Sequence, residues 1–253
     1  MMKRVFVLIA LIVVALGLKA QTIQNQEFAK ANFYYNESKY DTALVMYNRI
    51  IDAGYVSAPL LYNIGNTYFK LRNYPMAILN YEKALKLDPT NEEIKQNLAI
   101  ANALITDKIE PMPEFFLKKW WRGIGNRMSA NGWATFSIIM FALLLISLFI
   151  YLTTRSIGLK KTTFFTNILF VLLCICSVIF SSQKKSLMES SDMAIVITPT
   201  ITVKSSPSSS GVDLFVLHEG SKVEILDIIE GWDKIKISDG SVGWMPSSSS
   251  IKY

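Results

Sequence analysis

Few residues of this 253-residue chain have the chemistry that a catalytic or metal-binding site needs. His218 is the only histidine, so a histidine-based metal cluster cannot form within one chain. The only cysteines, Cys174 and Cys176, lie inside an apolar run, where a helix would point them to different faces. No nucleophile lies beside a general base in a recognisable pattern. We therefore expect no catalytic residue, no metal and no cofactor, and we predict that the chain is not an enzyme.

Two asparagines have the chemistry of peptide recognition instead. Asn32 and Asn66 occupy equivalent positions in two similar stretches of the chain, and a side-chain amide offers both a donor and an acceptor to a peptide backbone. Aromatic residues near them would add apolar contact. The alternative is that the asparagines only fill structural positions of a repeat, because repeat position alone does not prove ligand contact. The predicted partner-binding residues are Phe28, Asn32, Tyr35, Tyr62, Asn66 and Phe69.

The spacing of these asparagines belongs to an internal repeat. The same offset also aligns Ala43 with Ala77 and Tyr47 with Tyr81. Small residues let the two helices of one repeat approach closely, and aromatic residues fill the space between turns. A period of about 34 residues with this pattern resembles the tetratricopeptide repeat. This resemblance implies a concave, peptide-binding face lined by the first helix of each repeat. The predicted parts of this all-α domain at 21–110 are repeat one at 24–57, repeat two at 58–91 and a capping helix at 91–106.

The predicted array is short. Pro111 lies where the second helix of a third repeat would continue, so the helical pattern ends before it. Two repeats and a capping helix are close to the smallest array that is stable alone. We therefore expect the repeat domain to lean on a partner protein or on a second copy of itself.

Two apolar stretches, 133–152 and 163–182, contain no Lys, Arg, Asp or Glu. A helix rises about 1.5 Å per residue, so about 20 residues cross a hydrocarbon core of roughly 30 Å. Because lipid offers the backbone no hydrogen-bonding partner, these stretches predict a two-helix transmembrane hairpin. A buried hairpin of a soluble protein is the alternative, which this length and all-round apolarity disfavour. The connecting segment 153–162 is basic, and we expect it in the cytoplasm.

The N-terminus predicts on which side of the membrane the repeat domain lies. Residues 1–20 begin with Lys3 and Arg4, continue through an apolar run and end at Ala20, which is typical of a secretory signal peptide. An uncleaved anchor is the alternative. Either outcome delivers the repeat domain to the outer side, and the hairpin then returns the chain to that same side.

The net charge of +6 does not indicate nucleic-acid binding, because the basic excess lies beside the apolar stretches and at the N-terminus. Segment 111–132 is the clearest example. It mixes aromatic residues such as Trp120 and Trp121 with basic residues such as Lys118 and Arg122. This mixture next to a spanning helix predicts an interfacial linker, with rings at headgroup depth and cations among phosphates.

The C-terminal segment 191–253 has the pattern of a small all-β domain. Its short apolar–polar runs are separated by turn residues, and Asp239-Gly240 is a strong hairpin signal. Five or six strands in so short a segment imply a small barrel. The Ser-rich segment 247–250 is predicted to be a solvated tail. The candidate strands are 194–198, 201–205, 214–217, 221–229, 232–238 and 241–245.

Gly231-Trp232 and Gly243-Trp244, within 194–251, carry a resemblance to the bacterial SH3-like family. The resemblance implies a binding module, for cell-wall peptides or for protein segments. Trp232 and Trp244 either form a ligand face of the barrel or fill its core, and the weight of large aromatics in small cores favours the core.

The order of all these parts resembles the tetratricopeptide branch of the Bacteroides aerotolerance (Bat) family. The fold class expected is a multidomain membrane protein with an all-α tetratricopeptide repeat domain, a two-helix transmembrane hairpin and a small all-β SH3-like barrel. The resemblance implies a bacterial inner-membrane location, with both soluble domains periplasmic and with other membrane-bound Bat-type proteins as partners. We expect a protein-binding scaffold. The alternative is a sensor or tether whose SH3-like domain binds peptidoglycan.

Overall fold

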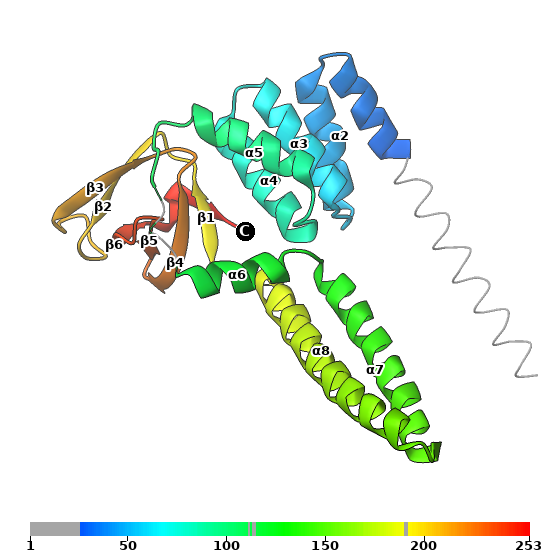
Figure 1. Ribbon diagram of the computed structural model, residues 1–253. Coiled ribbons are helices and arrows are strands. Elements are labelled where there is room, and N and C mark those ends of the chain that lie inside the picture. Colours follow the sequence, from blue (N-terminus) through cyan, green and yellow to red (C-terminus); the bar gives the residue numbers. More distant parts are fainter. Residues whose placement is uncertain (1–25, 111, 113–114, 190–191) are drawn as a thin grey trace, which may run out of the picture.

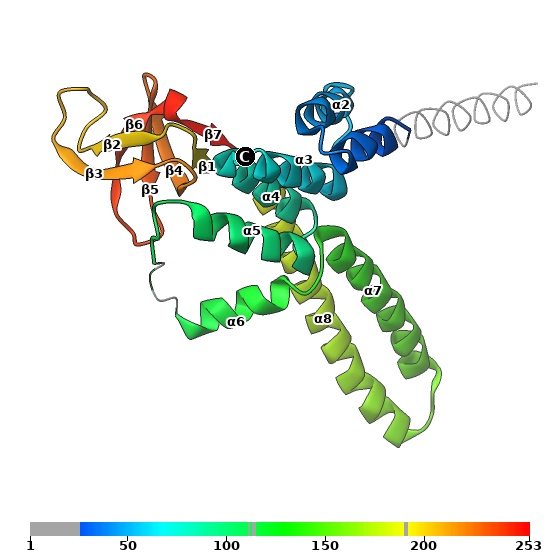
Figure 2. The same ribbon diagram turned by 90° about the horizontal axis from the view of Figure 1, so that it is seen from above.

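The computed structural model describes residues 26–110, 112, 115–189 and 192–253. Figure 1 shows three parts: a layer of short helices, a seven-stranded sheet beside it, and a long helical hairpin that points away from both. The predicted signal peptide at 1–20 lies outside the described residues. The two views agree that the short helices and the sheet lie on the same side of the hairpin, at the end opposite its turn (Figures 1 and 2).

The short helices begin where the sequence supplies capping residues. The side chains of Ser57, Asn73 and Asn91 each accept a hydrogen bond from the backbone N–H three residues later, which satisfies an orphan donor of the first turn. Pro59 and Pro75 lie in first turns, where the missing N–H costs little. The helices are 26–36, α2 (Tyr40–Asp52), α3 (Ala58–Lys70), α4 (Tyr74–Leu87) and α5 (Glu92–Leu104).

The hairpin consists of α7 (Ala130–Thr153) and α8 (Ile157–Glu189), preceded by the shorter α6 (Phe116–Gly125). Both long helices are long and apolar enough to cross a membrane, and they expose most of their apolar side chains. Small polar residues lie between them, including Cys174, whose Sγ is 3.5 Å from Oγ of Ser137. The turn occupies residues 154–156, so the helices extend beyond the predicted apolar runs and into the predicted link at 153–162.

The C-terminal segment forms one antiparallel sheet with the strand order β3-β2-β6-β5-β4-β1-β7. All six predicted strands are present within two residues of their predicted bounds. Its strands are β1 (Met193–Val196), β2 (Thr200–Lys204), β3 (Asp213–His218), β4 (Lys222–Ile229), β5 (Trp232–Lys236), β6 (Val242–Pro246) and β7 (Ser250–Lys252).

The solvated tail predicted at 247–250 is wrong. Residues Ser247–Ser249 form a 3₁₀ turn, and β7 pairs with β1. Ser249 is buried, and its backbone oxygen accepts a hydrogen bond from Ile197 at 2.9 Å. The hydroxyl of Ser247 donates to the buried carboxylate of Asp233 at 2.7 Å. Serine was misleading here because its hydroxyl is as useful for satisfying a buried acceptor as for contacting water.

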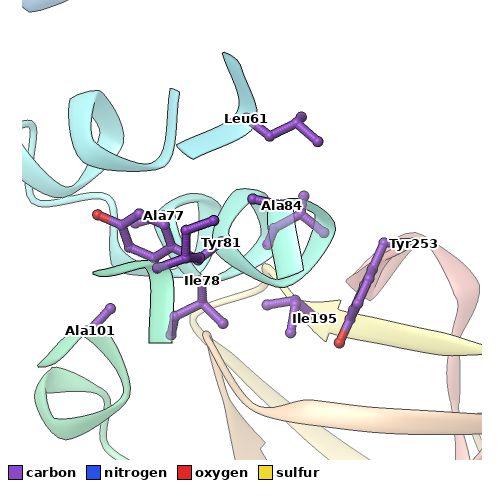
Figure 3. Close-up of a cluster of buried hydrophobic side chains, with 10 residues drawn as sticks. Leu61, Ala77, Ile78, Tyr81, Ala84, Ala101, Ile195 and Tyr253 are labelled. Carbon is purple, nitrogen blue, oxygen red and sulfur yellow. The ribbon is translucent and has the colours of Figure 1, made fainter. Parts of the chain in front are cut away.

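The sheet packs directly on the repeat helices. Ile195 of β1 and the C-terminal residue Tyr253 belong to the same buried cluster as Ala84 of α4 (Figure 3). The ammonium of Lys222 pairs with Glu82 of α4 at 2.8 Å, and that of Lys86 lies 5.0 Å from the centre of the Tyr253 ring. One hydrophobic core is therefore shared between a helical and a β unit.

The segment that follows α5 stabilises the contact between the helices and the sheet from a second side. Ile109 packs against the core of the sheet, and the backbone N–H of Met112 donates to Ser238 at 3.0 Å. Two residues before Ile109, Asp107 accepts hydrogen bonds from the hydroxyl of Ser221 at 2.6 Å and from the backbone N–H of His218 at 2.7 Å. The ring Nδ1 of His218 lies 2.7 Å from the other carboxylate oxygen. The predicted capping helix and linker thus include a strap, residues 105–110 and 112, that is bound to the sheet.

The hydrogen bonds of Asp107 to the sheet predict that the stability of the fold depends on pH. Burial alone would raise the pKa of this carboxyl, but the hydrogen bonds from Ser221 and His218 outweigh it and hold the pKa below its ordinary value of 3.8. A depressed folded-state pKa stabilises the fold fully above the ordinary value, and this contribution is lost as pH falls through the folded-state value. We expect Asp107→Asn to lower the free energy of unfolding by about 1–3 kcal/mol at neutral pH, because hydrogen bonds to a charged group are lost.

The measurement is thermal unfolding of the full chain in detergent, followed by circular dichroism from neutral pH to below pH 3.8. The difference between the two proteins should shrink at the acidic end. Asp52→Asn, on the exposed end of α2, is the matched control and should leave the unfolding temperature at the wild-type value across this pH range. Equal stability of wild type and Asp107→Asn at neutral pH would contradict the stabilising role of the Asp107 hydrogen bonds.

Candidate functional site

A ladder of hydrogen bonds connects the repeat helices on their inner side. In its first rung, Oδ1 of Asn32 accepts the hydroxyl of Tyr47 at 2.6 Å and the amide of Asn63 at 2.9 Å. These three residues belong to three successive helices, so one acceptor ties three elements together. Burial raises the pKa of Tyr47 to about 12, so its hydroxyl remains a hydrogen-bond donor throughout the physiological range.

The second rung repeats the first, one repeat further along the chain. Oδ1 of Asn66 accepts the hydroxyl of Tyr81 at 2.7 Å and the amide of Asn97 at 2.9 Å. The same amide of Asn97 also donates to the hydroxyl of Tyr62 at 2.8 Å. Burial raises the pKa of Tyr81 as well. The rung therefore joins α3, α4 and α5 through neutral groups.

Beside this second rung lies a groove with a volume of about 360 Å³. The first helix of the region, α3, α4 and α5 each contribute to its wall. Its rings and its Ile100 side chain offer apolar contact, and its amides and hydroxyls offer hydrogen bonds. It contains one cation, Lys70, and one anion, Glu93, so its lining is close to neutral. The lining residues are Tyr35, Tyr62, Asn66, Phe69, Lys70, Tyr81, Glu93, Asn97 and Ile100.

Four of the six predicted partner-binding residues line this groove: Tyr35, Tyr62, Asn66 and Phe69. The other two do not. Phe28 packs against the ring of Tyr47, with 6.0 Å between ring centres. Asn32 uses its oxygen in the first rung. The side-chain oxygens of both asparagines thus accept hydrogen bonds within the repeat helices, and Asn66 additionally lines the groove.

The prediction missed the contribution of α5. This helix was interpreted only as a cap, yet Glu93, Asn97 and Ile100 form one wall of the groove. The signal was present in the sequence, because Asn97 lies one repeat period after Asn63, and Ile100 lies one repeat period after Asn66. In α5 the apolar side chain of Ile100 therefore takes the repeat position that Asn66 has in α3, and Ile100 is 52% exposed.

Gly65 explains how Tyr81 reaches the ladder. A Cβ added at Gly65 would lie 2.6 Å from two ring atoms of Tyr81, which is closer than carbon atoms can pack. The absence of a side chain lets this edge of the ring lie directly against α3, with its hydroxyl at Asn66. The glycine therefore provides the room that the Tyr81 ring needs.

A second surface lies on the sheet. Along β5 and β6 the buried positions are Asp233, Ile235, Gly243 and Met245, so the intervening side chains point to the outer face. Trp232 and Trp244 are on that face and are half-buried, outside the core cluster. The two tryptophans therefore do not fill the core of the sheet, the position that the sequence analysis favoured for them. Lys234 lies between them, with its ammonium 5.9 Å from the centre of the Trp244 ring.

Comparison with known proteins identifies one of these parts. The sequence model of the tetratricopeptide repeat family matches residues 58–91. This range contains α3 and α4, which supply most of the groove. No curated protein matches the chain. The chain therefore contains a tetratricopeptide repeat, a module whose presence suggests protein–protein interaction.

The ladder predicts the effect of filling the space at Gly65. We expect Gly65→Ala to push the Tyr81 ring away from Asn66 and to destabilise the repeat helices by about 1–3 kcal/mol, the usual cost of overpacking. Hydrogen–deuterium exchange of the full chain in detergent should show faster exchange in α3 and α4.

Gly123→Ala is the matched control. Gly123 also lies inside a helix, but a Cβ there would meet no atom within 4 Å. Exchange in α3 and α4 should stay at the wild-type rate in this variant. The same rate in Gly65→Ala would show that the ring does not need the space that the glycine provides.

Proposed function

We propose that this chain is a non-enzymatic, membrane-anchored scaffold that binds an extended segment of a partner protein in the groove between α3 and α5. The observation that carries the proposal is the groove itself. Its asparagines, Asn66 and Asn97, and two of its tyrosines, Tyr62 and Tyr81, are fixed by the ladder before any partner arrives. Preorganised side chains lose little entropy on binding. The near-neutral lining suits a segment of mixed polarity better than a strongly acidic or basic one.

The hairpin supplies the anchor in this proposal. Two helices of 24 and 33 residues, exposed along their lengths, are suited to lipid. Because the hairpin begins and ends on one side, the groove and the sheet would face the same compartment. We infer from the predicted signal peptide that this compartment is the periplasm of a bacterium and that the hairpin lies in the inner membrane.

The order of the parts supports a BatE-like role. We infer that the C-terminal sheet is a bacterial SH3-like domain and that the partners are other membrane-bound Bat-type proteins. The support is the resemblance stated from the sequence, together with the repeat, the apolar hairpin and the antiparallel sheet in that order. A partner anchored in the same membrane would meet the groove at a limited height, which favours binding between neighbours in one complex.

A second candidate function rests on the outer face of the sheet. Trp232 and Trp244 are half-buried on this face, and the ammonium of Lys234 lies over the Trp244 ring. Rings of this kind stack on sugars, and an ammonium pairs with carboxylates, so the face suits a peptidoglycan fragment. Under this alternative the chain is a cell-wall sensor or tether. Sedimentation of the full chain with cell-wall sacculi, compared with W232A/W244A, tests it.

The groove predicts where a partner is captured. A photo-crosslinking amino acid at Phe69, which lines the groove, should give a discrete adduct in intact cells. The same amino acid at Phe33 is the control, because Phe33 is 57% exposed and does not line the groove. We expect no matching adduct there.

A charge inside the groove should then abolish the Phe69 adduct. Ile100→Glu places a second carboxylate beside Glu93, whereas Leu104→Glu changes an equally exposed residue of α5 outside the groove. We expect loss of the adduct only with Ile100→Glu. An adduct that survives Ile100→Glu, or that forms equally from Phe33, would overturn the groove as the partner-binding site.

A further inference from the structure

The short helix α6 has two opposed faces. At about 100° per residue, its apolar side chains occupy an arc of roughly 140°, and its cations occupy the opposite side. No acidic residue interrupts either face. The apolar face consists of Phe116, Leu117, Trp120, Trp121 and Ile124, and the basic face consists of Lys118, Lys119 and Arg122.

An aromatic cluster fixes one end of α6 to the hairpin. The ring of Phe180 in α8 lies 4.5 Å from that of Trp121 and 4.8 Å from that of Trp133, measured between ring centres. The indole N–H of Trp133 donates to the backbone oxygen of Gly125 at 3.0 Å. A Cβ at Gly125 would lie 3.1 Å from the Phe180 ring, so the glycine permits this approach. The direction of α6 is therefore set by packing.

That direction is sideways from the end of the hairpin. In both views α6 extends away from the hairpin beside the end of α8, at the end opposite the turn between α7 and α8 (Figures 1 and 2). If the hairpin crosses a bilayer, α6 then lies at the level where the two helices leave it. A helix in this place, with these two faces, has the features of one that lies in the membrane surface.

Most of the apolar face of α6 has no protein cover among the described residues. Phe116 is 67% exposed and Trp120 is 63% exposed. This exposed face adjoins the hairpin, because Trp121 of the same face packs on Phe180 of α8. Large rings left in water lose the stabilisation that burial of their apolar area would give. Contact with the hairpin identifies the material that covers the rings as the lipid around the hairpin.

The basic face identifies the kind of lipid. Lys118, Lys119 and Arg122 lie on one helix of ten residues. The C-terminal part of α8 adds Lys184, whose ammonium donates to Oδ1 of Asn126 directly after α6, and the neighbouring Lys185. Cations near an anionic membrane surface are attracted to it. Neutral lipid would bury the rings equally well but would give these cations no such attraction.

We propose that α6 is a binding site for anionic phospholipid, lying in the membrane surface with its rings in the acyl region and its cations among the headgroups. The proposal rests on the proposed function in one respect, since the hairpin must cross the same membrane. It goes further because it names a lipid class and fixes the height of the groove. With α6 held in the surface, the repeat and the sheet cannot swing freely on the hairpin.

Depth measurements by electron paramagnetic resonance test the position of α6. Spin labels are placed at single cysteines in the full chain with Cys174 and Cys176 replaced by Ser, reconstituted in vesicles of phosphatidylcholine and phosphatidylglycerol. We expect a label at Phe116 to collide mainly with oxygen, which concentrates in lipid. A label at Lys119, on the opposite face of the same helix, should collide mainly with a water-soluble nickel chelate. A label at Phe141, exposed on α7, reports whether the hairpin is inserted.

Three results would overturn the proposal, each in a recognisable way. Equal nickel exposure of the Phe116 and Lys119 labels, with the Phe141 label in lipid, would place α6 in water. A Phe116 label reached by neither reagent would mean that protein covers it. A Phe141 label exposed to nickel would remove the membrane anchor, and with it both this inference and the anchoring part of the proposed function.

The lipid class is tested with the variant K118Q/K119Q/R122Q. In the protein with the native cations, the Phe116 label should move deeper into the membrane when phosphatidylglycerol replaces part of the phosphatidylcholine. The ratio of oxygen to nickel collisions should then rise measurably. The variant should lose that response while its Phe141 label stays in lipid. An equal response in both proteins, or no response in either, would overturn the assignment to anionic lipid.

Discussion

The contact between α4 and the C-terminal sheet is the interaction on which the other parts depend. An array of two repeats has little buried surface of its own, which is why a partner protein or a second copy was expected to complete it. In the structure the same chain completes it. Ile195 and Tyr253 extend the core of the repeat, and the strap holds the other side through the hydrogen bonds of Asp107. The hairpin makes this possible because it returns the chain to its starting point.

The ladder and the groove follow from this support. Each rung needs three helices at fixed distances, and the second rung includes α5, which leads directly into the strap. A strap bound to the sheet therefore limits how α5 can move, and α5 forms one wall of the groove. In the proposed function the sheet thus acts on partner binding without touching the partner. The aromatic cluster at Phe180 has the corresponding role between α6 and the hairpin.

Local patterns in the sequence were sufficient for the elements. The repeat period located the helices, the apolar stretches located the hairpin, and turn residues such as Asp239-Gly240 located the strands. Repeat position also pointed to four of the residues that line the groove. Contacts between distant segments were not predictable in this way. Nothing local distinguishes Tyr253 as a core residue of the repeat, or Ser249 as a buried residue rather than part of a tail, because their surroundings come from elements far away in the chain.

The most direct test of this account is hydrogen–deuterium exchange of the full chain after removal of the Tyr253 ring. Tyr253 is 8% exposed and lies between the sheet and α4, whereas Tyr55 is 37% exposed at the end of repeat one. With Tyr253→Ala we predict faster exchange in α4, α5 and the strap residues 105–110, and no such change with Tyr55→Ala. Exchange in α4 that stays at the wild-type rate in Tyr253→Ala would contradict the claim that the sheet supports the repeat.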